Sequence, residues 1–155
     1  MNVLSPQEIL KAAVMIEERG EAFYRLAAKQ TKEKQAADLF THLADEEVKH
    51  RETFAGLMSQ LADRPSLESY PQEMLEYVSA FVKNVIFPNP ETAARAAAND
   101  VHAAIAFALQ RELDSIHFYQ ETRPLLLTRR ENPLDAIIAE ERKHFLALLD
   151  LKAKL

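Results

Sequence analysis

Leu43-Ala-Asp-Glu-Glu-Val-Lys-His50 is the most informative stretch of the sequence, because it places Glu47 and His50 three residues apart in a segment of helical periodicity. Residues three apart in an α-helix lie on the same face, about one turn from each other. The same Glu-x-x-His motif recurs at Glu141 and His144. Two copies on two predicted helices indicate a repeated structural unit.

Each copy of the motif follows another glutamate at nearly the same distance. Glu17 precedes Glu47 by 30 residues, and Glu112 precedes Glu141 by 29. In steps of three and four residues, all four glutamates fall on stripes that are apolar at both ends and acidic in the middle. Four carboxylates facing one core would repel one another, and each would be costly to desolvate unpaired. Since no stripe carries Lys or Arg, we expect other cations between them.

Two divalent metal ions would balance the charge of the four carboxylates. A Glu from each of two helices, together with Glu-x-x-His from each of the other two, is the ligand set of carboxylate-bridged di-iron and di-manganese bundles. We therefore expect two metal ions per chain. The candidate ligands are Glu17, Glu47, His50, Glu112, Glu141 and His144.

The chain resembles the ferritin-like superfamily and, within it, most closely the rubrerythrin group. The resemblance rests on segments 16–24 and 43–50 and on their repeat copies at 110–119 and 139–144, and it covers essentially the whole chain. It implies an all-α fold, a ferritin-like four-helix bundle. A long crossover between the second and third bundle helices should contain a short extra helix.

The composition is that of an ordinary soluble protein, and we expect residues 1–155 to form a single domain. Two glycines in 155 residues favour long helices over a turn-rich β protein. A net charge of −5 without a basic cluster argues against nucleic-acid and membrane partners. The start of the sequence lacks the features of a signal peptide, and no apolar run approaches membrane-spanning length, so we expect a cytoplasmic protein.

The sequence contains no cysteine, which excludes disulfides, zinc–thiolate sites, iron–sulfur centres and thiol catalysis. It also excludes an attached rubredoxin domain, which rubrerythrins often carry and which needs cysteine ligands. Electrons for any redox reaction would therefore come from an external electron-transfer protein.

Helical periodicity, capping residues and prolines predict five helices. Ser5, Pro6 and Glu8 predict a capping box at the start of the first helix. The connection 63–89 is longer than two antiparallel neighbours need, so the second and third bundle helices should run parallel. Pro124 should interrupt the third bundle helix. The expected ranges are about 6–29, 33–62, 71–87, 90–122 and 133–153.

The extra helix expected over 71–87 carries an apolar stripe that includes Val78, Val82 and Ile86. This stripe could pack on its own bundle or be buried in a dimer interface, and the sequence leaves both interpretations open. The assembly that we expect is a homodimer.

Several polar residues near the candidate ligands fall off the stripes. We expect the three direct neighbours Glu18, Glu46 and Glu140, about 100° away, to be solvated. Glu21 lies one turn after Glu17, but its counterpart in the repeat is Ile116, which argues against a ligand. The remaining histidines are expected at the surface or the rim: His42, His102 and His117.

Tyr24 and Tyr119 lie seven residues after Glu17 and Glu112, on the same stripes. Helical side chains lean towards the N-terminus, so each hydroxyl is directed back towards the level of the carboxylates. The two residues are either core tyrosines that need a hydrogen-bond partner or residues that orient a metal-bound carboxylate. Both descriptions can hold at once.

Ser115 departs from the rubrerythrin pattern, which typically has a second glutamate one turn after the ligand of the third bundle helix. This chain has Glu112-Leu-Asp-Ser115 instead of Glu-x-x-Glu. The six candidate ligands therefore resemble the near-symmetric set of bacterioferritin more closely, which bears on whether a peroxide reductase activity is retained.

The resemblance implies a non-haem di-iron oxidoreductase that reduces peroxide or dioxygen with electrons from an external donor. An alternative is an iron-oxidising storage or carrier protein that resembles ferritin or bacterioferritin. A third is a helical module in which the metal only stabilises the fold. Oxygen-rich sites with two imidazoles and no sulfur suit iron, with manganese or zinc as alternatives.

Overall fold

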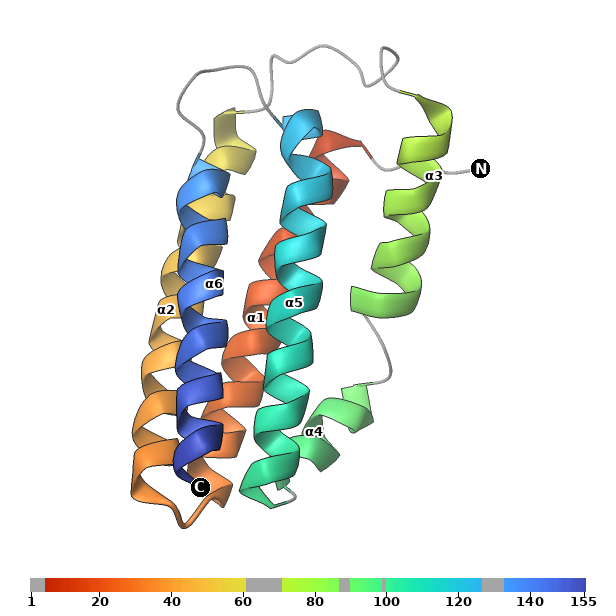
Figure 1. Ribbon diagram of the computed structural model, residues 1–155. Helices are drawn as coiled ribbons and strands as arrows, with labels where there is room; N and C mark the ends of the chain where they lie inside the picture. Colours follow the sequence, from red (N-terminus) through yellow and green to blue (C-terminus); the bar gives the residue numbers. More distant parts are fainter. Residues whose placement is uncertain (1–4, 61–70, 87–89, 99, 127–132) are drawn as a thin grey trace.

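The computed structural model describes residues 5–60, 71–86, 90–98, 100–126 and 133–155, and every regular element within these ranges is a helix. Long helices form a four-helix bundle (Figure 1): α1 (Pro6–Gln30), α2 (Lys34–Gln60), α5 (Val101–Leu126) and α6 (Pro133–Lys154). Between α2 and α5 come α3 (Gln72–Phe81), a π-helical turn (Val82–Ile86) and α4 (Pro90–Ala98). None of the described helices combines the length and apolar character that a membrane span requires.

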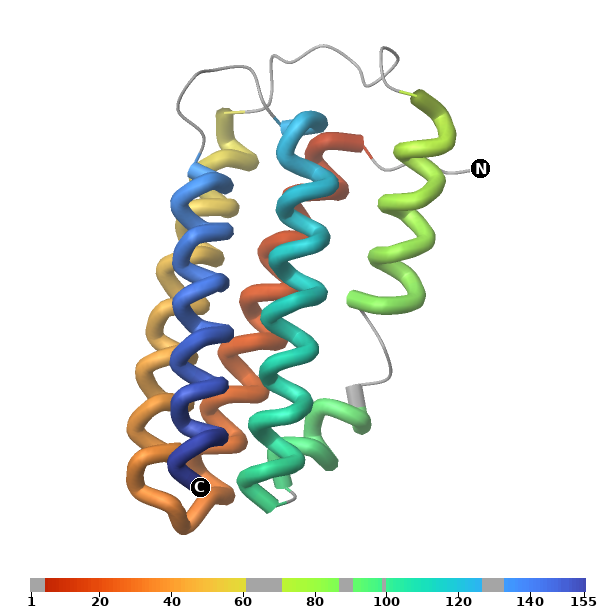
Figure 2. The backbone as a smooth tube through the Cα atoms, in the orientation of Figure 1, coloured from red at the N-terminus to blue at the C-terminus, as the bar shows by residue number. Residues whose placement is uncertain are grey.

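The bundle consists of two antiparallel pairs. Helix α1 packs against α2, and α5 packs against α6. Figure 2 shows α2 and α5 running in the same direction, while α3 and α4 follow one another along the side of the bundle. The predicted long crossover with an extra helix is therefore confirmed, and with it the predicted ferritin-like topology.

The start of α1 is fixed by the capping box that the sequence predicts. The Ser5 hydroxyl accepts a hydrogen bond from the Glu8 backbone N–H at 3.2 Å, and the Glu8 carboxylate accepts one from the Ser5 backbone N–H at 2.7 Å. Two amide groups that have no partner within the helix are thereby satisfied.

Helix α3 packs on its own bundle through the predicted apolar stripe. Val78 and Ile86 are buried in a cluster that also contains Phe118 of α5. Tyr77 Oη lies 2.6 Å from His117 Nε2, a second tie between α3 and α5. Of the two interpretations of this stripe, the structure supports packing on its own bundle, because the bundle covers Val78 and Ile86.

The helix expected over 71–87 changes from α to π at Val82. The side-chain amide of Asn84 donates to the Ala80 carbonyl at 2.8 Å. In an α-helix the backbone N–H of Asn84 would use that same carbonyl, so the side chain competes with the α pattern. Arg111 then donates to the Ile86 carbonyl at 2.9 Å, which satisfies an acceptor at the end of the π turn.

The prediction of a single helix over 90–122 is wrong, because the structure has two helices in this region, α4 and α5. Asp100 begins α5: its carboxylate accepts from the Ala103 backbone N–H at 2.9 Å, and its carbonyl accepts from Ala104. An aspartate in this position is a favourable N-cap. The alanine-rich sequence around it masked the cap.

Pro124 does not end α5, contrary to the prediction from the sequence. A proline inside a helix costs about 3 kcal/mol. Leu125 and Leu126 follow it and are buried in the core, and burying a leucine stabilises by about 1.5–3 kcal/mol each. Burial of two leucines offsets the cost of the proline and extends the helix.

A layer of polar side chains divides the apolar core into two clusters. On each bundle helix, the buried Glu and His residues stand between a segment of the first cluster and a segment of the second. The first cluster includes Leu10, Phe54, Phe118 and Leu134, and the second includes Phe23, Phe40, Leu43, Ile105 and Leu148. The apolar, acidic and apolar order predicted along each stripe is therefore the order of layers in the bundle.

Candidate metal centre

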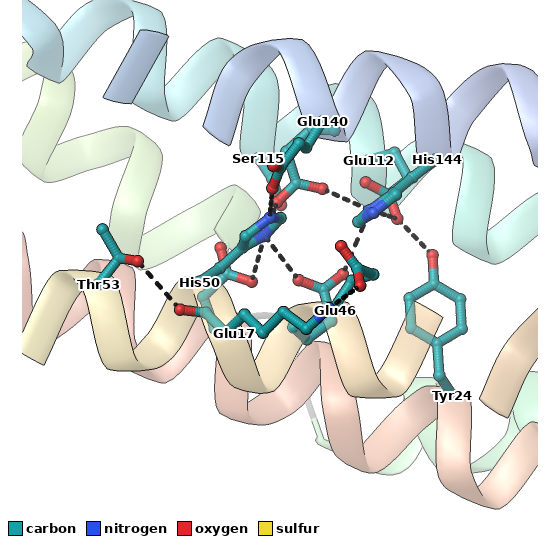
Figure 3. A network of polar contacts seen from close by, with 12 residues as sticks. Glu17, Tyr24, Glu46, His50, Thr53, Glu112, Ser115, Glu140 and His144 are labelled. Carbon is teal, nitrogen blue, oxygen red and sulfur yellow. Dashed lines mark hydrogen bonds and ion pairs between the residues drawn. The ribbon is translucent and has the colours of Figure 1, made fainter. Parts of the chain in front are cut away.

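The polar layer consists of the six predicted ligands, brought together from all four bundle helices (Figure 3). Each side chain is buried, with residue exposures between 1% and 5%. Helices α1 and α5 supply one glutamate each, and α2 and α6 supply Glu-x-x-His. The residues are Glu17, Glu47, His50, Glu112, Glu141 and His144.

The six residues form two groups with the geometry of metal sites, and the groups share two members. Glu17 and His50 belong to the first group, and Glu112 and His144 to the second. The carboxylates of Glu47 and Glu141 belong to both. Within each group, one ligand atom per residue lies within 4.8 Å of the others. Two neighbouring ions with two shared carboxylates fit this arrangement.

The shared carboxylates turn one oxygen to each histidine. Glu141 Oε1 lies 3.1 Å from His50 Nδ1, and Glu141 Oε2 lies 3.1 Å from His144 Nδ1. Glu47 Oε2 and Oε1 lie 3.4 Å and 3.9 Å from the same two nitrogens. Both imidazoles therefore present Nδ1 to the carboxylate cluster, as a ligand nitrogen would be presented.

Burial and mutual repulsion control the protonation of the cluster. Burial, together with Glu141 and Glu17, raises the pKa of Glu47 well above its ordinary value. Burial and Glu141 raise the pKa of Glu112 to about 8. Burial alone would lower the pKa of His144, but its hydrogen bonds with Glu112 and Glu141 raise it to about 10. Protons thus replace cations when no metal is bound.

One atom of the cluster tests whether the residues fit a metal. Glu47 Oε2 is buried and accepts no hydrogen bond among the described residues, although His50 Nδ1 lies 3.4 Å away. A buried carboxylate oxygen without a hydrogen bond is costly, and a bound cation would stabilise it. The oxygen-rich donor set with two imidazoles suits hard or borderline divalent ions. The residues present therefore fit a pair of metal ions.

Both predicted tyrosines donate hydrogen bonds to carboxylates of the cluster. Tyr24 Oη donates to Glu112 Oε1 at 2.5 Å, and Tyr119 Oη donates to Glu17 Oε1. Each bond crosses between α1 and α5, so each tyrosine contacts the glutamate of the other helix. The two hydroxyls fix the orientation of the unshared carboxylates.

Glu140 is not simply solvated, contrary to the prediction from the sequence. Its carboxylate lies 2.6 Å from His50 Nε2, the nitrogen on the far side of the ring from the cluster (Figure 3). With the proton on Nε2, this contact leaves Nδ1 free to bind a metal. Its position directly before the ligand motif Glu141-x-x-His144 hinted at a role near the site. The contact itself joins α6 to α2, so it could not be predicted without the fold.

The other polar residues near the cluster are either exposed or paired with residues outside it. Glu18, His42 and His102 are exposed, as predicted. Glu21 forms ion pairs with Arg25 and Arg51. Glu46, which the sequence predicts to be solvated, is instead half-buried and pairs with Lys49 at 2.5 Å. His117 is the half-buried partner of Tyr77. Ser115 is buried and donates to the Arg111 carbonyl at 2.9 Å.

The family model for rubrerythrin matches residues 8–152. The chain belongs to the rubrerythrin family. It is also similar to a solved structure from Thermotoga maritima that is described as a ferritin-like diiron-carboxylate protein, with 25% sequence identity and a TM-score of 0.76. That match covers 99% of this chain and 97% of the other. A comparison with curated proteins finds no match. Together with the buried Glu and His cluster, these similarities indicate a di-metal site in this chain.

The metal-free protein should lose stability as the pH rises from about 4.5, the ordinary pKa of Glu112, to about 10, the pKa of His144 in the folded state. The folded pKa of Glu112 lies above its ordinary 4.5, and that of His144 lies above 6.5. The folded state therefore holds more protons than the unfolded chain in this range, so stability falls with pH. Thermal melts in the presence of a chelator measure this. Glu112→Gln should flatten the slope below about pH 8, and a wild-type melting temperature that rises with pH would contradict the assignment.

Replacement of Glu140 by alanine should weaken the affinity for Mn²⁺ or Zn²⁺ by about 10–100-fold, because His50 loses the partner that orients its ring. Glu18→Ala is the matched control, since Glu18 also adjoins a candidate ligand but is exposed. Competition with a chromophoric chelator gives both affinities. Equal affinities of the two variants would show that Glu140 does not support the site.

Proposed function

We propose that the protein is a non-haem di-iron oxidoreductase that reduces peroxide or dioxygen with electrons from an external carrier. The observation that supports this most strongly is the sharing of Glu47 and Glu141 by two ligand groups. Shared carboxylates would hold two ions close together, and two redox-active ions would supply the capacity for two-electron reduction of an O–O bond. Membership of the rubrerythrin family supports the same chemistry.

In this proposal each residue of the cluster has a defined role. Glu47 and Glu141, which belong to both ligand groups, would be the ligands that the two ions share. Glu17 with His50 and Glu112 with His144 complete the two sites. Iron is the proposed metal, because carboxylate and imidazole ligands without sulfur suit it, and manganese or zinc are the alternatives.

The surrounding residues would orient the ligands and exclude water. Tyr24 and Tyr119 hold the carboxylates of Glu112 and Glu17 through their hydroxyls. The apolar clusters above and below the polar layer limit access of solvent to it. Such a shell fixes ligand geometry before any oxidant arrives.

The second candidate is an iron-oxidising storage or carrier protein, as in ferritin and bacterioferritin. Ser115 favours it, because Ser115 occupies the position where rubrerythrins typically have a further glutamate. We propose a cytoplasmic homodimer rather than a storage shell. Light scattering on the native protein separates the two, since a shell requires many subunits and a dimer requires two chains of 17.6 kDa.

Anaerobic reconstitution should load two iron ions per chain, and the reduced protein should then react with hydrogen peroxide faster than with dioxygen. Stopped-flow spectra should show an absorbing ferric product. Glu18→Ala should behave like the wild type, since Glu18 is exposed. A reproducible single equivalent of iron would overturn the dinuclear assignment, and a much faster reaction with dioxygen would favour ferroxidase activity.

A further inference from the structure

A cavity of about 220 Å³ lies between α1, α4 and α5 and reaches the carboxylate cluster. Its wall includes Glu17, Glu47 and Glu112, one residue from each of α1, α2 and α5. Away from these carboxylates the wall is mostly apolar, with Phe23, Leu26, Ile86, Ala93 and Phe107. The cavity therefore joins an apolar chamber to the proposed metal centre.

The volume of the cavity can be compared with the volumes of the molecules that it could bind. A water molecule occupies about 30 Å³ in the liquid, and hydrogen peroxide is only slightly larger. An engineered apolar cavity of about 150 Å³ accommodates benzene. The volume of about 220 Å³ thus exceeds the needs of dioxygen or hydrogen peroxide and suffices for a substituted ring or a short branched alkyl chain.

Two small residues, Gly20 and Ser115, line the cavity near the carboxylates. A Cβ atom on Gly20 would stand only 3.5 Å from Glu47 Cδ, so a longer side chain here would enter the space beside that carboxylate. Ser115 lies in the same wall, where the longer glutamate of the rubrerythrin pattern would take up more of it. Both residues keep the chamber continuous with the cluster.

Arg111 is a polar group in the wall with unused donor capacity. Its Nη1 donates to the carbonyls of Ile86 and Val85, at 2.9 Å and 3.4 Å. Its guanidinium has five N–H donors, and these two carbonyls are the hydrogen-bond acceptors found for it among the described residues.

We propose that the cavity binds the organic part of an alkyl or aryl hydroperoxide and that such hydroperoxides are the substrates of the site. This inference rests on the proposed peroxide reduction and names its substrate class. The apolar group fills the chamber against Phe23 and Phe107, whose rings contact each other at a centroid distance of 4.9 Å and form one apolar wall, and the peroxide group points to the carboxylates.

The reaction is balanced with the external electron carrier as reductant. The O–O bond of the hydroperoxide breaks, and the molecule takes up two electrons from the carrier and two protons from solvent. An alcohol and water form, and the carrier is oxidised by two electrons. The alcohol keeps the organic group, so it should bind the cavity even where no redox reaction occurs.

Binding of 2-phenyl-2-propanol, the alcohol that forms from cumene hydroperoxide, tests the cavity without any redox step. Calorimetric and NMR titrations of metal-free and zinc-loaded wild type should show one saturable site. Ala93→Leu should weaken binding at least about tenfold, because it fills the wall. Ala98→Leu is the matched control, since Ala98 lies at the end of the same helix, α4, but does not line the cavity. Ala94→Trp, elsewhere in the same wall, is the second filling variant if Ala93→Leu does not fold.

Turnover supplies the second readout. With reduced iron-loaded protein, the ratio of kcat/KM for cumene hydroperoxide to that for hydrogen peroxide should fall at least about tenfold in the filling variant and stay constant in Ala98→Leu. No binding of the alcohol to wild type, or equal binding to the filling variant, overturns the inference. Failure to reduce either peroxide overturns the proposed function instead, and the binding result identifies which of the two has failed.

Discussion

The mutual repulsion of four buried carboxylates is the constraint on which the rest of the structure depends. Glu17, Glu47, Glu112 and Glu141 are each less than 5% exposed and share one layer of the core. Each would be costly to bury as an unpaired anion. Two histidines and two tyrosine hydroxyls contact these carboxylates and offset part of this cost, and the geometry of the cluster suits two cations. Without these partners, a layer of this charge would open the bundle.

The topology follows from the need to bring this layer together. Four helices must present their acidic segments at one level, and two antiparallel pairs with a crossover along the bundle achieve this. The apolar clusters on either side stabilise this layer and cover it towards both ends of the bundle. Asp100 caps the start of α5, which is separate from α4, and the cavity beside the carboxylates lies between these two helices and α1. The packing of the helices thus determines both the position of the carboxylate cluster and the cavity through which small molecules would reach it.

The sequence predicted the bundle and all six cluster residues because helical period and charge burial act on local patterns. The departures involve contacts that local patterns do not contain. Glu140 reaches His50 across 90 positions, so no spacing rule could pair them. Pro124 was expected to end a helix, but burial of the following leucines outweighs its cost. Asp100 was a recognisable cap that the alanine-rich context obscured.

Calorimetry of the wild type and Glu47→Leu, each with and without Fe²⁺ under anaerobic conditions, tests the central claim most directly. A metal that binds only the assembled site, at a thousandfold excess over Kd, should stabilise the wild type by about 4 kcal/mol. Metal-free Glu47→Leu should melt above the metal-free wild type, because a repelling buried charge is gone, and Fe²⁺ should raise its melting temperature much less. A wild-type melting temperature that is the same with and without Fe²⁺ would contradict a buried metal site at the centre of this bundle.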